Sequence, residues 1–323
     1  MRRSLSSRGR PMNDFDTSAQ STPSRPPDAL PTFKNDAARD RYLAAYDAAV
    51  RDWPIACEEL DIPSRWGSTH VIVSGPADAP PLVLLPSFAG TATAWRLNVA
   101  GLSAHYRTYA IDVIAQPGKG WSHRRLRDRR EYADWLGEVL DGLGLSRVSI
   151  VGCSFGGFLA LNQASLTPQR VERVVMISPV GSFASQLWKL TYSARIKRPL
   201  VKLWRRLSGS KRAPGMTDLG VRPPRDTLWA ALMATTMMPA FSAVGVINPA
   251  VLSRRELRAI RAPALLLIGD AERLYEPAAM ARLARKRMPA LETAVVADAD
   301  HVAAMAQPDE VNARILRFLQ PRD

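Results

Sequence analysis

The sequence predicts an α/β protein with a mostly parallel sheet that is covered by helices on both faces. Short apolar segments alternate with helix-like stretches along most of the 323 residues, which is the order in which helices join parallel strands. Residues 81–86 (PLVLLP) are apolar throughout and bounded by prolines. Such a run is typical of a strand that is buried on both faces.

The individual elements can be placed along the chain. A helix is expected from Asn35 or Asp36, either of which can cap it, to the Trp53-Pro54 step. Apolar residues recur at helical spacing in this stretch. Further helices are expected at about 131–144 and 155–166, and after residues 276 and 307. Strands are expected at residues 69–74, 81–86, 106–113, 147–152, 171–178, 263–269 and 291–297.

The alternation of strands and helices stops at residue 181 and resumes at about residue 255. This pattern indicates one α/β core, formed by residues 35–180 and 256–323, into which residues 181–255 are inserted as a helical cap. Residues 1–34 are rich in Ser, Pro and Arg and poor in large apolar side chains. We expect them to be a disordered tail.

The formal net charge of +14 is unevenly distributed. Residues 1–11 carry four Arg and no acid, and residues 186–225 carry eleven Lys and Arg against one acid, which accounts for the whole excess. The arginines of residues 124–130 are offset by acids elsewhere and are expected to form a solvated face. Because the rest of the chain is neutral and has no recognised nucleic-acid-binding motif, nucleic acid is not expected as a partner.

Composition argues against several other classes. The two cysteines, Cys57 and Cys153, cannot form a disulfide framework, and no Cys or His residues stand at metal-ligand spacing. No apolar run reaches the ~18 residues of a spanning helix, and residues 1–11 lack the apolar stretch of a secretory signal. We therefore expect a cytoplasmic protein that uses neither metal nor cofactor.

The strongest functional signal is the motif G-x-S-x-G at Gly152, Ser154 and Gly156. It lies directly between the predicted strand 147–152 and the predicted helix 155–166. In this setting a tight, strained turn lifts the serine above the sheet as a nucleophile. A Cβ at either glycine would collide with neighbouring backbone.

A nucleophilic serine needs a base to take its proton. His301 follows the predicted strand 291–297 on a late loop and satisfies the chain order serine, acid, histidine, so it is the expected base. The other histidines are His70, His105 and His123.

The acid that orients this histidine is expected on the loop after strand 263–269. Glu272 is favoured, because the acid of this architecture usually lies a few residues into the loop, and Asp270 is the alternative. Asp298 and Asp300 flank His301; they are expected to be solvated loop acids, although either would raise the proton affinity of that ring.

The oxyanion of an acyl-transfer reaction needs two backbone N–H donors. One is expected at Phe155, directly after the nucleophile. The other is expected at Phe88, on the loop that follows strand 81–86.

Several longer phrases accompany the motif, namely RWGSTHVIVSG, APPLVLLP, TATAWRLNVAGL, YRTYAIDVIAQPGKG, VGCSFGGFLALNQA, APALLLIGDAERLYEP and QPDEVNARILRFL. On these, the chain resembles the α/β-hydrolase superfamily over residues 50–323, and within it small bacterial carboxylesterases that use Ser, Glu and His. The resemblance implies an α/β-hydrolase fold with an eight-stranded, mostly parallel sheet and a cap inserted after strand 171–178. It also implies Glu272 as the acid, three residues after Gly269.

The chain departs from this family pattern at two places. Pro86-Ser87 stands where the family often has His-Gly, and Asp300 stands where a glycine usually precedes the histidine. Asp112 and Gly118 match a structural turn of the family and are not expected to be catalytic.

These features predict a serine hydrolase that cleaves a carboxylic ester or thioester through an acyl-enzyme intermediate. The fold does not by itself fix the reaction, so an acyltransferase or a C–C bond hydrolase on the same residues is the alternative enzyme. A non-catalytic binding protein of the same fold is the alternative outside enzymes. The intact set of Ser154, Glu272 and His301 argues against it.

The cap sequence contains a predicted basic amphipathic helix. Leu200, Leu203, Trp204 and Leu207 share one face of it and Lys202, Arg205 and Arg206 the other. The simplest interpretation is a cap helix that packs its apolar face over the site with its arginines in water. The two functional alternatives are docking to an anionic membrane surface and recognition of an acidic or carrier-bound acyl substrate.

Overall fold

The computed structural model of the protein describes residues 25–30, 33–185 and 247–320. Residues 186–246 of the predicted cap, with its basic helix, and residues 1–24 of the predicted tail lie outside the described residues. Where the described chain borders this insertion, Ser182 and Val251 pair as an isolated parallel bridge. Both residues belong to the predicted insertion of residues 181–255, so its two described ends lie side by side.

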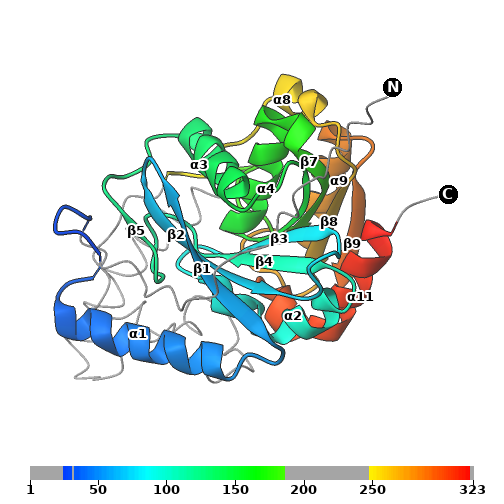
Figure 1. The fold of residues 1–323 in the computed structure, drawn as a ribbon. Coiled ribbons are helices and arrows are strands. Elements are labelled where there is room, and N and C mark those ends of the chain that lie inside the picture. Colours follow the sequence, from blue (N-terminus) through cyan, green and yellow to red (C-terminus); the bar gives the residue numbers. More distant parts are fainter. Residues whose placement is uncertain (1–24, 31–32, 186–246, 321–323) are drawn as a thin grey trace, which may run out of the picture.

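A nine-stranded mixed sheet runs through the middle of the described fold (Figure 1). Its strands follow the order β1-β2-β4-β3-β6-β7-β8-β9, and the short β5 pairs with β2 off this path. The β1–β2, β2–β4 and β2–β5 pairs are antiparallel, and every pair from β4 to β9 is parallel. The strands are β1 Cys57–Ser64, β2 Gly67–Ser74, β3 Pro81–Leu85, β4 Arg107–Ile111, β5 Trp121–Ser122, β6 Val148–Cys153, β7 Val171–Ile177, β8 Ala264–Gly269 and β9 Glu292–Val296.

Helices cover both faces of this sheet, as the α/β prediction requires (Figure 1). The α-helices are α1 Asp36–Arg51, α2 Arg96–Ser103, α3 Arg129–Gly142, α4 Phe155–Leu166, α8 Arg254–Ala259, α9 Pro277–Arg287, α10 Ala303–Ala306 and α11 Pro308–Leu319. Two short 3-10 helices occupy Ala92–Trp95 and Pro168–Arg170. The helices predicted from residue 36, at about 131–144, at 155–166 and after residues 276 and 307 correspond to α1, α3, α4, α9 and α11.

The sheet separates two apolar cores. Val83 and Leu85 of β3 pack into one core with α3, α4, α8 and α9, whereas Leu82 and Leu84 pack into the other with α1, α2, α10 and α11. All four side chains are fully buried. The apolar run of residues 81–86 therefore reflects burial on both faces, as predicted from the sequence.

All seven predicted strands are present, and the path of eight strands agrees with the number that the resemblance implies. The ninth strand, β5, has only two residues. The residue-by-residue prediction missed β1, which contains Pro63 and three acids and leaves most of its side chains partly or fully exposed. An edge strand of this kind lacks the apolar alternation by which strands are recognised.

The N-terminal helix α1 is anchored to the centre of the fold. The Asn35 side chain caps it by accepting a hydrogen bond from the N–H of Ala38 at 2.9 Å. Tyr42 and Tyr46 on its inner face are fully buried. Phe33, in the segment predicted as tail, packs on Tyr42 with ring centroids 5.0 Å apart, so contacts with the fold begin before Asn35.

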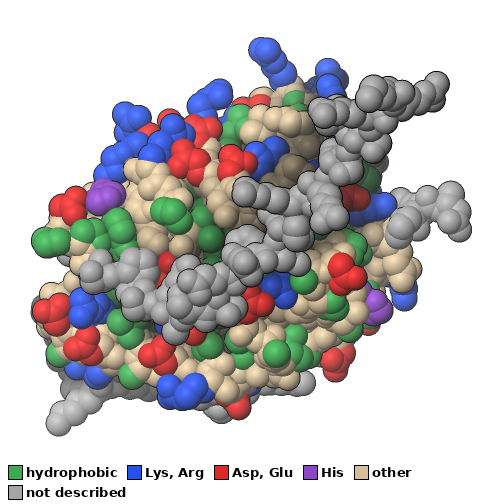
Figure 2. Space-filling view, viewed as in Figure 1, with side chains coloured by type: hydrophobic (Ala, Val, Ile, Leu, Met, Phe, Trp, Pro, Cys, Tyr) green, Lys and Arg blue, Asp and Glu red, His purple; other side chains and the backbone are tan. Residues whose placement is uncertain are grey.

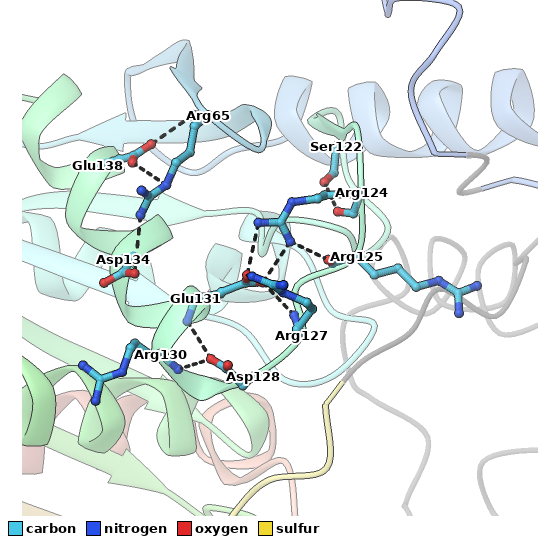
Figure 3. Close-up of polar contacts among 10 residues, drawn as sticks. All are labelled: Arg65, Ser122, Arg124, Arg125, Arg127, Asp128, Arg130, Glu131, Asp134 and Glu138. Carbon is cyan, nitrogen blue, oxygen red and sulfur yellow. Dashed lines mark hydrogen bonds and ion pairs between the residues drawn. The ribbon is translucent and has the colours of Figure 1, made fainter.

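Two of the arginines in residues 124–130 form ion pairs with an acid (Figure 3). Arg124 and Arg127 both bind the Glu131 carboxylate of α3. The contact with Arg124, supported by Arg127, lowers the pKa of Glu131 to about 2. Lys and Arg side chains gather along the upper edge of the molecule (Figure 2), where α3 and α8 lie in the same view. The expected solvated face therefore also contains ion pairs with Glu131.

Candidate active site

The turn between β6 and α4 holds Ser154 in an unusual backbone conformation. Ser154 has φ +53° and ψ −110° and is only 5% exposed. A positive φ in a residue with a side chain stores strain, which often occurs at functional sites. A Cβ at Gly152 would lie 2.1 Å from the carbonyl oxygen of Gly156, and one at Gly156 would lie 2.2 Å from that of Leu85. Both glycines of the motif are thus required for this turn to form.

His301 links Ser154 to Glu272. Its Nε2 lies 2.8 Å from the Ser154 hydroxyl oxygen, and its Nδ1 lies 2.7 Å from Glu272 Oε2. The other carboxylate oxygen of Glu272 accepts hydrogen bonds from the N–H groups of Arg273 and Leu274, at 2.8 and 2.9 Å. The three predicted residues thus lie in one continuous hydrogen-bonded chain.

The environment of Glu272 favours its charged form. Burial acts to raise the pKa of this carboxyl, but its contacts with His301 and with backbone N–H groups outweigh burial and lower the pKa. A carboxylate that stays charged next to an imidazole stabilises the protonated ring.

Asp270, the alternative acid, has a different contact. Its carboxylate accepts hydrogen bonds from the N–H groups of Asp298 and Ala299, at 3.1 and 3.2 Å. It therefore joins the loop after β8 to the loop that carries His301. The geometry favours Glu272 over Asp270 as the partner of the imidazole.

The two acids that flank His301 differ in burial. Asp298 is exposed and has φ +52°. Asp300 is only 3% exposed, and its carboxylate accepts a hydrogen bond from the N–H of Val302 at 3.1 Å. The expectation of a solvated loop acid was therefore wrong for Asp300, because its carboxylate is buried against the backbone of the residues that follow it.

The two predicted oxyanion donors lie at distinct backbone positions. Phe155 is the first residue of α4, so its N–H has no acceptor within the helix. Phe88 lies in the turn from Ser87 to Gly90, closed by a 2.9 Å hydrogen bond from the Gly90 N–H to the Ser87 carbonyl. The chain just before this turn touches Gly156, since a Cβ there would meet the Leu85 and Pro86 carbonyl oxygens.

The remaining histidines have other surroundings. His70, in β2, lies between Glu59 and Asp61 of β1, with 2.9 Å to each carboxylate. His123 contacts Asp28, and His105 is exposed after α2. In the described part of the chain none of these three contacts Ser154, so His301 is the imidazole that meets the serine.

Comparison with known sequences identifies the family. The sequence model of the alpha/beta hydrolase family matches residues 82–314. The chain belongs to the α/β hydrolase family.

Curated relatives of this hydrolase extend over most of its length. It is 34% identical to the uncharacterized carboxylesterase nap of Bacillus subtilis over 292 residues, which are 86% of this chain and 92% of that protein. It is 31% identical to carboxylesterase YbfK of the same organism, over 86% of this chain and 93% of that protein. Among solved structures, naproxen esterase from Bacillus subtilis matches with a TM-score of 0.73 and 33% identity, covering 89% of this chain and all of that one.

Residues that the sequence did not single out also surround the site of this hydrolase. Ser178, after β7, is fully buried with φ +44°, and its hydroxyl acts to lower the pKa of Glu272. Tyr275 is buried beside the same two residues. Gln116 is buried and accepts a hydrogen bond from the Ala89 N–H at 2.7 Å. No motif marks these positions, because their contacts are made only when distant loops come together.

The described part of the hydrolase was compared with the requirements of a membrane-spanning helix and of a metal site. None of its helices there combines the length and the apolar character needed to cross a bilayer. Within the same residues, no three His, Cys, Asp or Glu side chains form a group suited to hold a metal ion.

Proposed function

We propose that this α/β hydrolase is a carboxylesterase that cleaves esters through an acyl-enzyme on Ser154. The observation that carries the proposal is the hydrogen-bonded chain from Ser154 through His301 to Glu272. The carboxylesterase relatives at 34% and 31% identity support the same reaction.

In the acylation step, His301 Nε2 takes the hydroxyl proton of Ser154 as the serine oxygen attacks the ester carbonyl carbon. Glu272 stabilises the imidazolium that forms and holds its Nδ1–H in place. The imidazolium then gives its proton to the departing alcohol oxygen as the carbon–oxygen bond of the ester breaks. The acyl group stays on Ser154.

In the deacylation step, the same imidazole activates a water molecule. His301 takes a proton from the water, whose oxygen attacks the acyl carbon, and then returns a proton to Ser154 as the carboxylic acid leaves. The enzyme ends in its starting protonation state.

Each tetrahedral intermediate carries negative charge on the former carbonyl oxygen. The N–H groups of Phe155 and Phe88 are the proposed donors to this oxyanion. The Phe155 N–H belongs to the first turn of α4, where the helix dipole also favours negative charge.

The test of this function is turnover of a 4-nitrophenyl ester by Ser154→Ala. We expect the loss of almost all turnover, because the substitution removes the oxygen that carries the acyl group in this mechanism. Ser149→Ala is the matched control, since Ser149 is a buried serine of β6, the strand that leads to Ser154, and is not part of the hydrogen-bonded chain. Activity that persists in a folded Ser154→Ala protein would contradict the proposal.

The substrate is a small-molecule ester on this proposal. Two roles of the basic cap face stay predictions: contact with an anionic membrane surface, and contact with an acidic or carrier-bound acyl substrate. A cytoplasmic location also stays a prediction. Sedimentation with anionic vesicles at moderate salt tests the membrane alternative, and an ester panel with and without acidic groups tests the substrate alternative.

A further inference from the structure

The turn that carries Phe88 has a conformation that its sequence does not favour. The hydrogen bond from the Gly90 N–H to the Ser87 carbonyl makes residues 87–90 a β-turn with Phe88 and Ala89 at its centre. Ala89 has φ +57°, whereas Phe88 is not among the residues with positive φ. This combination defines a type II turn, in which the third position normally holds glycine.

An alanine at this position makes the turn prone to rearrange. Types I and II differ mainly in the orientation of the central peptide, here the one between Phe88 and Ala89. In a type I turn the third residue has negative φ, which an alanine adopts without strain. Something outside the turn must therefore keep the central peptide in its observed orientation.

Gln116 makes the contact that does this. Its Oε1 accepts a hydrogen bond from the Ala89 N–H at 2.7 Å, and Gln116 is only 4% exposed. The Ala89 N–H belongs to the central peptide, so a flip of that peptide would break this bond. A buried N–H that loses its acceptor costs free energy, so the bond opposes the flip.

The loop that presents Gln116 is itself fixed to the same region. The buried Asp112 carboxylate accepts hydrogen bonds from the N–H groups of Ala92, at 2.8 Å, and Lys119, at 2.9 Å. Tyr46 of α1 donates its hydroxyl proton to the same carboxylate at 3.2 Å. Two buried hydrogen bonds, one from Ala89 in the turn and one from Ala92 just after it, therefore join this segment to the loop of residues 112–119.

We propose that Gln116 is a positioning residue for the oxyanion hole: by holding the central peptide, it fixes the Ser87–Gly90 turn and so the place of the adjacent Ser87–Phe88 peptide, whose N–H is offered to the oxyanion. This role rests on the proposed esterase function, in which Phe88 is a donor. Oxyanion-hole donors contribute most when they are fixed before the reaction begins. Gln116 acts on this preorganisation through the backbone and has no contact with the reacting atoms.

The test compares Gln116→Met with Thr69→Val. Methionine has about the size of glutamine but offers only a weak acceptor to the Ala89 N–H. Thr69→Val is the matched control, because it removes the buried acceptor of the Trp135 indole N–H, at 2.8 Å, away from the oxyanion turn. Both variants lose one buried hydrogen bond, so they share any general effect on stability.

We expect Gln116→Met to lower kcat for a 4-nitrophenyl ester by roughly 10- to 100-fold with little change in KM. Its affinity for a trifluoromethyl ketone, which forms a tetrahedral oxyanion on the serine, should fall in parallel. Thr69→Val should keep kcat within about twofold of the unmodified protein.

A second substitution makes the expectation specific to the turn. Glycine adopts positive φ without strain, so Ala89→Gly should recover most of the lost kcat in the Gln116→Met background. A merely structural role of Gln116 would not be repaired in this way, since glycine adds no contact.

The outcomes separate the two proposals. If the unmodified protein shows no more ester turnover than Ser154→Ala, the esterase function fails and the role of Gln116 fails with it. If the unmodified protein is active but Gln116→Met and Thr69→Val have equal kcat, or Ala89→Gly recovers nothing, then only the role of Gln116 is overturned.

Discussion

Nε2 of His301 lies 2.8 Å from the hydroxyl oxygen of Ser154, although 147 positions separate the two residues in the chain. Ser154 follows β6, Glu272 follows β8 and His301 follows β9. These strands belong to the parallel part of the sheet. Because parallel strands end at the same edge, three short loops deliver the serine, the acid and the imidazole to one place.

The contacts of the two acids after β8 predict different effects of their removal. Glu272→Gln should lower kcat by roughly 10³-fold or more, because the amide neither stabilises the imidazolium nor fixes the ring. Asp270→Asn should have a much smaller effect, since its amide oxygen can still accept one of the two hydrogen bonds from residues 298 and 299. Steady-state kinetics with one ester compares them, and a larger loss in Asp270→Asn would reverse the assignment of the acid.

Two glycines, Gly156 and Gly137, are expected to respond in opposite ways to substitution by alanine. Gly156→Ala should destabilise the fold by about 2 kcal/mol or more, because its Cβ would lie 2.2 Å from the Leu85 carbonyl oxygen. Gly137→Ala is the matched control: it lies within α3 with nothing within 4 Å of an added Cβ. This substitution should stabilise the protein by up to about 1 kcal/mol. Urea unfolding of both variants measures the difference, and equal stabilities would contradict the observed contact.

His70 predicts a dependence of stability on pH. Burial acts to lower the pKa of His70, but its contacts with Asp61 and Glu59 outweigh burial and raise the pKa from 6.5 to about 9. The pKa of Glu59 is lowered from 4.5 to about 2, chiefly by His70. A group with a raised pKa stabilises the fold below its unfolded value and loses that effect as pH rises through its folded value. The contribution of His70 is therefore present below about pH 6.5 and lost towards pH 9.

This dependence can be isolated by substitution. In the unmodified protein, we expect the free energy of unfolding to fall by roughly 1–3 kcal/mol from this source between pH 6.5 and 9. His70→Gln should remove that part of the slope, and His105→Gln, at an exposed position, should leave it unchanged. If the free energy of unfolding falls equally with pH in the unmodified protein and in His70→Gln, the ion pairs between β1 and β2 do not cause the loss of stability between pH 6.5 and 9.

Much of the site could be predicted because its residues have local signatures. The motif around Ser154 occurs between a strand and a helix that are both visible in the sequence, and the chain order selects His301. The position of Glu272 in the loop favoured it as the acid but did not exclude Asp270, because both lie on the same loop. Their contacts differ only once the loop before His301 folds against Asp270.

The parts that could not be predicted depend on contacts between distant segments. β1 pairs with β2 along its whole length, and its Glu59 and Asp61 contact His70 across the sheet. Acids in a short segment do not indicate a strand. The positive φ of Ala89 could not be predicted from the sequence either, since an alanine does not indicate a type II turn. Gln116 explains that conformation only when residues 86–92 and 112–119 are seen together.

The formation of an acyl-enzyme on Ser154 is tested most directly by labelling with a fluorophosphonate, followed by peptide mass spectrometry. We expect one phosphonyl adduct per chain on Ser154, formed in the folded protein and absent after heat denaturation, and no adduct in Ser154→Ala. Folded protein that hydrolyses an ester but gains no adduct, or gains it on another residue, would contradict a reaction through Ser154.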